Sequence, residues 1–259
     1  KGYTEIYCLC NNAGIMAVDD TITKNDGYEV QMQTNHLSHF LLTAELFPLI
    51  KAASKKYGDA RITQHSSLAR LKTKHQKLEE KYLLHYEKDG QLGGNEKPKG
   101  GDFDLKGGPW YRYSQTKLAN SIFNQALADQ LSKSNDIDCR NIVATCAHPG
   151  LSRTNLSDHL LKDAGFLICK ILGPLIQLFL FQSASDGSMG ILRGIMDNKS
   201  SLECGTLYGP ALSIKPKVSP SFTGLAIANP TLPYETDQKS KDMLWRLSEK
   251  ATGIEFKIP

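Results

Sequence analysis

Tyr113 and Lys117 lie four positions apart in the run WYRYSQTKLAN (110–120), and their side chains could act together on a proton. On a helix, residues at i and i+4 lie one above the other on the same face. A phenol has a pKa of about 10, and a nearby ammonium group favours the phenolate and lowers that pKa. The pair therefore predicts a general acid/base, although Tyr–Lys pairs at this spacing are also common on helix surfaces.

Further polar residues occur in three turns, and each turn follows an apolar run. The turns are NNAG (11–14), SSLA (66–69) and HPGLSRT (148–154). Taken singly, such segments are ordinary turns, helix caps or the ends of helices and strands. Their common position after expected strands indicates that they act together.

The elements that would position these groups alternate between strands and helices. We expect strands over 5–10, 60–67, 140–150 and 204–209. We expect helices over 26–56, 111–133, 183–197 and 234–252, with Pro48 bending or ending the first. This alternation predicts a parallel, layered α/β sheet, which binds ligands beyond the carboxyl ends of its strands. The three turns fall at that edge.

Other segments are expected to lie outside the core. Residues 70–108 are rich in Lys, Glu and Gly, and we interpret them as an insertion. Residues 210–233 contain five prolines and are expected to be irregular. The apolar run 164–181 is short and interrupted by charge, glycine and proline, so a lid over a lipophilic substrate is favoured over a membrane span. Peripheral attachment to a membrane is the alternative for this run.

The composition is that of a globular protein with one large core. The chain has 259 residues, 40% of them hydrophobic and 22% charged, with a net charge of +4. No stretch combines dense Lys and Arg with interleaved aromatic residues, so no nucleic-acid surface is expected. Six scattered cysteines without metal-ligand spacing predict no metal site and a reducing compartment, either the cytoplasm or the inside of an organelle. His36 and His39 are interpreted as helix-packing or surface residues.

The motifs NNAG, NHLSHFLLT (35–43), SSLA, YSQTKLAN (113–120) and HPGLSRT occur in the order found in a known family. With them the chain resembles the short-chain dehydrogenases/reductases. NHLSHFLLT, YSQTKLAN and LWRLSEKATG (244–253) resemble the retinol-dehydrogenase-like branch. The resemblance implies one domain with a doubly wound parallel sheet, a Rossmann-like fold, whose substrate side lies in residues 156–233. It also implies a nicotinamide-dependent oxidoreductase that interconverts a carbonyl and an alcohol on a lipophilic molecule, with NADP as cofactor and NAD as the alternative.

The same resemblance assigns catalytic roles. Tyr113 would be the general acid in reduction and the general base in oxidation, and Lys117 would lower its pKa and hold the nicotinamide ribose. Ser67 would hydrogen-bond the substrate oxygen; it is chosen over Ser66 because small or apolar residues follow it. Asn35 would distort its helix and hold a water that relays protons to Lys117.

Residues on the cofactor side are also implied by the resemblance. They are Asn12, Ala13, Gly14, Pro149, Gly150, Ser152 and Thr154, in addition to Tyr113 and Lys117.

The chain departs from the family in three ways: a missing phosphate loop, a long 70–108 segment and a polar strand that ends at His65. No T-G-x-x-x-G-x-G phosphate loop occurs, so we expect βαβ units to precede Lys1 in a longer parent; without them cofactor binding would be weak. The long 70–108 segment and GGDFD (100–104) instead resemble the protochlorophyllide reductases, which would make light the trigger of turnover.

A non-catalytic relative that serves as a binding module is the third hypothesis. The polar strand ending at His65 indicates either relaxed selection or a histidine that faces the cofactor.

Overall fold

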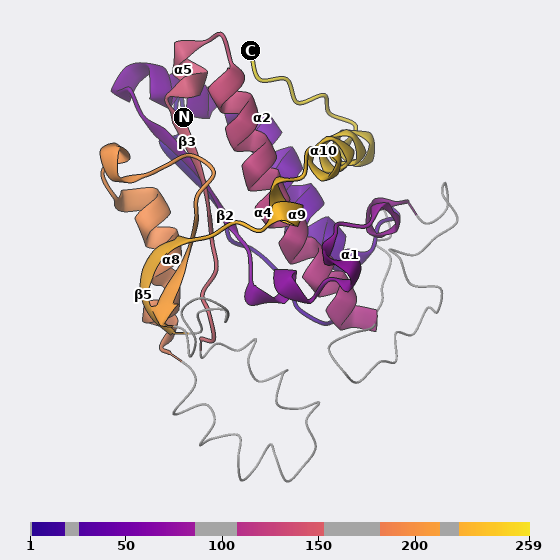
Figure 1. The fold of residues 1–259 in the computed structure, drawn as a ribbon. Helices are drawn as coiled ribbons and strands as arrows, with labels where there is room; N and C mark the ends of the chain where they lie inside the picture. The colour runs from indigo at the N-terminus through magenta and orange to yellow at the C-terminus, as the bar shows by residue number, and fades with distance from the viewer. Residues whose placement is uncertain (1, 19–25, 86–107, 153–181, 213–222) are drawn as a thin grey trace.

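A five-stranded sheet forms the centre of the computed structural model, which describes residues 2–18, 26–85, 108–152, 182–212 and 223–259 (Figure 1). In space the strands follow chain order: β1 (Cys8–Asn11), β2 (Ala60–His65), β3 (Ile142–Ala147), β4 (Leu207–Leu212) and β5 (Thr223–Asn229). The first four strands are parallel, and β5 pairs antiparallel with β4. The predicted α/β fold with a mostly parallel sheet is confirmed.

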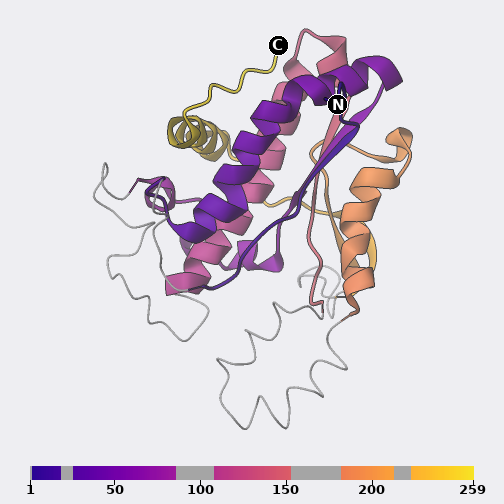
Figure 2. The ribbon, with the colours of Figure 1, turned by 180° about the vertical axis from the view of Figure 1, so that it is seen from behind.

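Helices cover both faces of this sheet (Figures 1 and 2). α2 (Ser38–Tyr57) and α4 (Gly108–Lys133) pack on one face, and α8 (Ala184–Met196) packs on the other. The apolar core lies mainly on the α2 and α4 side, where Phe40, Ile62 and Ile122 are buried. A sheet covered on both faces needs strands without exposed polar faces, and β2 and β3 are almost wholly buried.

Shorter elements complete the described chain. They are α1 (Val30–Met32), the π-helical turn η1 (Gln33–Leu37), the 3-10 turns η2 (Leu68–Lys72), η3 (Lys74–Gln76), η4 (Glu80–Leu83) and η6 (Lys199–Ser201), and the short helices α5 (Ile137–Arg140) and α9 (Pro233–Thr236).

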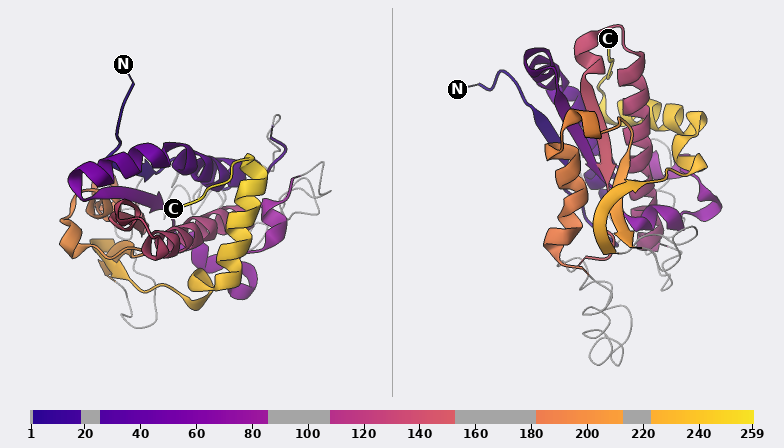
Figure 3. Two further views of the ribbon diagram at one scale, coloured as in Figure 1. Left: turned by 90° about the horizontal axis from the view of Figure 1, so that it is seen from above. Right: turned by 60° about the vertical axis from the view of Figure 1, so that its left-hand side comes forward.

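The C-terminal helix α10 (Gln238–Thr252) lies across the outer side of α4 (Figure 3). Its Trp245 stacks on Phe256 with ring centroids 5.1 Å apart, and it also meets Phe40 and Phe123 edge-on or tilted. This aromatic cluster buries a large apolar area and fixes the end of the chain to the core.

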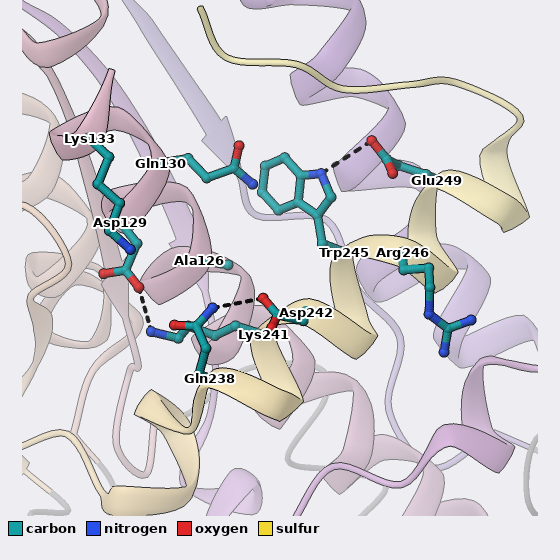
Figure 4. A pocket seen from close by; sticks show the side chains of 10 residues that line it. All are labelled: Ala126, Asp129, Gln130, Lys133, Gln238, Lys241, Asp242, Trp245, Arg246 and Glu249. Carbon is teal, nitrogen blue, oxygen red and sulfur yellow. Dashed lines mark hydrogen bonds and ion pairs between the residues drawn. The ribbon is translucent and has the colours of Figure 1, made fainter. Parts of the chain in front are cut away.

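A hollow of about 240 Å³ separates α4 from α10 (Figure 4). Several of its polar groups bond to one another: Lys241 pairs with Asp129, and the indole of Trp245 donates to Glu249. Gln238 likewise donates to Asp242 at 2.7 Å. These hydrogen bonds and the ion pair join α10 to α4 and, within α10, join residues one turn apart.

Three expectations need correction. Residues 70–85 do not lie outside the core, because Leu78, Tyr82 and Leu83 are buried in the main apolar cluster. Within 210–233, residues 223–229 form strand β5, since the prolines of this region fall on either side of a proline-free run. Pro48 neither ends nor divides α2, which continues to Tyr57.

Two expected segments lie outside the described residues: the rest of the insertion, 86–107, and the apolar run 164–181. Among the helices that the structure describes, none is both long and apolar enough to cross a bilayer.

Candidate active site

A cleft of about 490 Å³ opens at the carboxyl ends of β1, β2 and β3. Because parallel strands end at one edge, the turns that follow them meet there, as the sequence predicts. The cleft is lined by Asn12, Gly14, Ile15, His65, Ser66, Ser67, Tyr113, Lys117, Pro149, Ser152, Ala184, Gly187, Ser188 and Ile191. Most of the residues singled out in the sequence are thus brought to one place.

Tyr113 lies on α4 and is only 5% exposed. Burial raises its pKa to about 12, and a side-chain hydrogen bond with Ser67 acts in the opposite direction. The expected lowering of this pKa by Lys117 is therefore not found. The physical reason is that desolvation of the phenolate outweighs the nearby stabilising groups. In this state the phenol is protonated at neutral pH and can donate a proton.

Lys117 lies one helical turn after Tyr113 and faces the same cleft. Its Nζ donates a hydrogen bond to the carbonyl oxygen of His65 at 3.0 Å and lies 5.7 Å from the centroid of the Tyr113 ring. Burial lowers the pKa of Lys117 to about 8. The ammonium is therefore still largely charged near neutrality, close to the phenol but not bonded to it.

Ser66 and Ser67 have separate roles in the structure. The Ser66 hydroxyl is buried and donates to the Lys117 carbonyl oxygen at 2.6 Å, which ties β2 to α4. The Ser67 hydroxyl accepts from the Ala69 amide at 3.2 Å, and it acts to lower the pKa of Tyr113. Ser67 is half-buried at the cleft wall and is the serine that can meet a substrate oxygen.

Asn35 lies in the π-helical turn η1, so the helix is distorted at this residue as expected. Its Oδ1 accepts from the Ile15 amide at 2.8 Å, and its Nδ2 donates to the Ile15 carbonyl oxygen at 2.9 Å and to Thr116. These bonds anchor the loop after β1. A Cβ atom added to Gly14 would lie 3.2 Å from Asn35 Oδ1 and 3.4 Å from Lys117 Nζ, so a side chain here would crowd both groups.

Only some of the residues expected on the cofactor side line the cleft. Asn12, Gly14, Pro149 and Ser152 line the cleft. Ala13 and Gly150 are neighbours of lining residues, and Gly150 adopts a positive φ of 64° that suits glycine. Thr154 lies outside the described residues.

His65, whose role the sequence leaves open, faces the cleft. Its Nδ1 lies 2.6 Å from the Asn12 Oδ1, so the neutral ring can donate to this amide oxygen. Burial and the charge of Lys117 lower the pKa of His65 to about 3. The ring is therefore neutral over the physiological range.

Five lining residues were not anticipated from the sequence: Ile15 after β1, and Ala184, Gly187, Ser188 and Ile191 from α8. A stripe of glycines on this helix lets it approach the sheet; a Cβ on Gly194 would lie 2.4 Å from Thr145 Oγ1. The spacing of small residues in SASDGSMG was the available signal for this close contact.

The described parts of the chain hold no cluster of three or more His, Cys, Asp or Glu side chains that could bind a metal ion. Cys8, Cys10, Cys139, Cys146 and Cys204 are unpaired thiols.

Comparison with known proteins identifies the family. No family model matches the chain. Short-chain dehydrogenase TIC 32 A, chloroplastic, of Brassica napus is 32% identical over 181 residues, which cover 70% of this chain and 48% of that protein. Retinol dehydrogenase 14 of Mus musculus is 28% identical over 250 residues, which cover 95% of this chain and 59% of that protein. The chain belongs to the short-chain dehydrogenase/reductase family.

A solved structure has the same fold. An uncharacterized protein from Mycobacterium paratuberculosis, known from a crystal structure, superposes with a TM-score of 0.65 at 27% identity, covering 99% of this chain and 70% of that one. Short-chain dehydrogenases/reductases use NAD(P). The chain spans about half the length of the curated relatives it matches, between 39% and 59% for the first four.

Proposed function

We propose that this chain forms the catalytic part of an NAD(P)-dependent oxidoreductase that interconverts a carbonyl and an alcohol on a lipophilic substrate. Tyr113 is the proton donor and acceptor, Ser67 binds the substrate oxygen, and Lys117 supplies positive charge. The observation that carries the proposal is the meeting of these three side chains, from two separate segments, at one cleft.

The cleft fits a nicotinamide cofactor. Its volume of about 490 Å³ lies within the range of small-molecule sites, about 300–1,000 Å³. Gly14, after β1, is exposed at the cleft and places no side chain in it, whereas Gly187 on α8 lets Ser152 pack against that helix. Lys117 and Asn12 would bind its hydroxyl groups, and Pro149 and Ser152 would line its amide end. When bound, the nicotinamide supplies or accepts the hydride.

In carbonyl reduction, negative charge develops on the substrate oxygen. The Ser67 hydroxyl donates a hydrogen bond to this oxygen, and Tyr113 then transfers its phenolic proton to it. The raised pKa of Tyr113 keeps that proton in place at neutral pH. The ammonium of Lys117 stabilises the phenolate that is left behind, because it is held near the ring in a buried site.

The proposed substrate is apolar. Ile15, Pro149 and Ile191 contribute aliphatic surface to the cleft, and retinol dehydrogenases are among the relatives. NADP is proposed on the likeness to that branch. Side-by-side coenzyme assays with NADPH and NADH test this preference directly.

Replacement of Tyr113 by Phe tests the mechanism in the full-length protein. We expect Tyr113→Phe to lower turnover of an aliphatic or retinoid aldehyde with NADPH by about 10²- to 10⁴-fold, with the unfolding temperature and NADPH affinity retained. Tyr111→Phe is the matched control, because Tyr111 lies on the same helix outside the cleft. Full turnover by Tyr113→Phe would exclude Tyr113 as the proton donor.

The two alternatives give different results in the same assays. A protochlorophyllide-reductase-like enzyme turns over only in light, and Ser67→Ala leaves its activity largely intact. A binding module shows no turnover in either condition, and Tyr113→Phe changes none of its measured properties.

A further inference from the structure

A buried ion pair lies directly behind the cleft serine. The Nε of Arg70 donates to Oε1 of Glu235 at 2.7 Å, and these side chains are 4% and 0% exposed. Arg70 belongs to the 3-10 turn η2 that Ser67 caps, whereas Glu235 belongs to α9, 165 positions later. The pair therefore connects the serine turn to the C-terminal part of the fold.

The Glu235 carboxylate is held from several sides. Its Oε1 also accepts from the Ser121 hydroxyl at 2.8 Å, and its Oε2 accepts from the Leu232 amide at 2.8 Å. Ser121 lies one turn after Lys117 on α4. The carboxylate thus has a fixed position relative to the helix that carries Tyr113 and Lys117.

Arg70 in turn holds the backbone of Ser67. Its backbone amide and its guanidinium Nη1 both donate to the Ser67 carbonyl oxygen, at 3.1 and 3.3 Å. The Ser67 hydroxyl accepts from the Ala69 amide and acts to lower the pKa of Tyr113. A shift of the guanidinium would move the carbonyl and with it the hydroxyl.

We propose that Arg70 and Glu235 are positioning residues for Ser67, and that they couple α9 and α4 to the geometry of the serine–tyrosine pair. The inference rests on the function proposed above. A buried ion pair contributes little net stability, because desolvation of both charges offsets their attraction. Its planar, charged geometry can instead fix the position of a neighbouring group. A group that makes a catalytic hydrogen bond must be held to within about 0.5 Å of its working position.

Glu235→Gln is the first test variant in the full-length protein. It keeps the size of the side chain and one amide oxygen, which can replace one of the two carboxylate oxygens as acceptor, but it removes the charge that orients Arg70. We expect kcat to fall about 10- to 100-fold with KM within about threefold of its original value. Arg70→Lys retains a charge for Glu235 but cannot also reach the Ser67 carbonyl oxygen, so we expect a smaller loss in the same direction.

Asp59→Asn is the matched control. Asp59 accepts two hydrogen bonds from the buried Arg61, at the opposite end of β2 from the cleft, and its own side chain is 14% exposed. We expect this variant to lower the unfolding temperature while kcat remains within about twofold of its original value. Equal losses of kcat in Asp59→Asn and Glu235→Gln would overturn the proposal, since general destabilisation would then explain both.

A double-mutant cycle with Ser67→Ala makes the test specific. If Glu235 acts through Ser67, Glu235→Gln should change kcat by less than about twofold when Ser67 is already alanine. Full additivity of the two losses would show that Glu235 acts elsewhere.

A readout without turnover separates this inference from the proposed function. The ionisation of Tyr113 can be followed by ¹⁹F NMR in protein labelled with difluorotyrosine, whose phenol ionises at lower pH, with Tyr113→Phe for assignment. Glu235→Gln and Ser67→Ala should both raise the apparent pKa of Tyr113, whereas Asp59→Asn should not. This shift would support the positioning role even in a protein that reduces no carbonyl, and its absence would overturn that role even in an active enzyme.

Discussion

The ammonium nitrogen of Lys117 donates a hydrogen bond to the backbone carbonyl oxygen of His65, 3.0 Å away. Lys117 is only 4% exposed, and burial lowers its pKa from 10.5 to about 8. A carbonyl dipole replaces only part of the hydration that a charged amine loses. The fold therefore holds this charge at the cleft at a cost in stability.

We predict that Lys117→Met stabilises the protein at pH 7 while it removes the proposed turnover. The pKa of Lys117 is lower in the folded state than in the unfolded state. Burying the ammonium therefore lowers the free energy of unfolding by its full amount below about pH 8, and this loss disappears as the pH rises toward 10.5. At pH 7 the free energy of unfolding should increase by about 1–3 kcal/mol, less the value of the lost hydrogen bond. Urea unfolding at pH 7 and pH 10 measures this difference.

The exposed Lys133, at the end of the same helix, provides the control. Lys133→Met should change the free energy of unfolding by less than about 0.5 kcal/mol at either pH. A Lys117→Met variant that is less stable than the original protein at pH 7 would contradict the prediction.

The sequence was sufficient to predict the four parallel strands, the helices that cover them and the edge at which polar residues meet, but not the antiparallel strand β5. Strand ends and the i, i+4 pairing of Tyr113 and Lys117 follow from local pattern and from the geometry of parallel sheets. For that reason Asn12, Ser67 and Pro149 were expected beside Tyr113, and the cleft contains all of them.

Other features depend on tertiary packing that no local pattern encodes. Desolvation sets the pKa of Tyr113, and the degree of burial is known only once the helix is packed. The same holds for Leu83, which lies in a segment of charged composition but packs into the core, and for Glu235, whose partner Arg70 is 165 positions away.

Asn35 gives a prediction about the loop after β1. Asn35→Ala leaves the amide and carbonyl of Ile15 without their partners, so we expect the free energy of unfolding to fall by about 1–3 kcal/mol and NADPH binding to weaken. Asn35→Asp retains the bond from the Ile15 amide but loses the two donated bonds, and its effect should be intermediate. Urea unfolding and coenzyme titration measure both effects. A variant that alters only the pH dependence of turnover would instead favour a proton-relay role for Asn35.

Gly194 gives a prediction about the packing of α8. A Cβ atom at this position would lie 2.4 Å from Thr145 Oγ1 and 2.9 Å from Thr63 Oγ1, which are hydrogen-bonded to each other at 3.0 Å. We expect Gly194→Ala to lower the free energy of unfolding by about 1–3 kcal/mol, although alanine favours helix over glycine by about 1 kcal/mol. Ser185→Ala on the exposed face of α8 should be neutral or slightly stabilising. Equal stability of these two variants would show that α8 can move away from the sheet without loss.

Buried histidines predict sensitivity to acid. Burial lowers the pKa of His36, His65 and His148 to about 3 and that of His39 to about 4, against 6.5 for the ordinary side chain. Because the unfolded chain binds these protons more tightly, stability is fully present above about pH 6.5 and is lost as the pH falls toward the folded values. Each histidine should contribute a slope of about 1.4 kcal/mol per pH unit in that interval.

His39 is the most informative of these residues, because neither ring nitrogen has a hydrogen-bond partner and Lys117 adds to the lowering of its pKa. Between pH 7 and pH 5 its protonation in the unfolded state should cost about 2 kcal/mol, so His39→Leu should lose about 2 kcal/mol less stability over this interval. Urea midpoints measured at half-unit steps of pH provide the comparison, with the exposed His75→Leu as control. Parallel curves for His39→Leu and the original protein would mean that His39 ionises as readily in the folded chain as in the unfolded one, and that the interior near Lys117 is open to water.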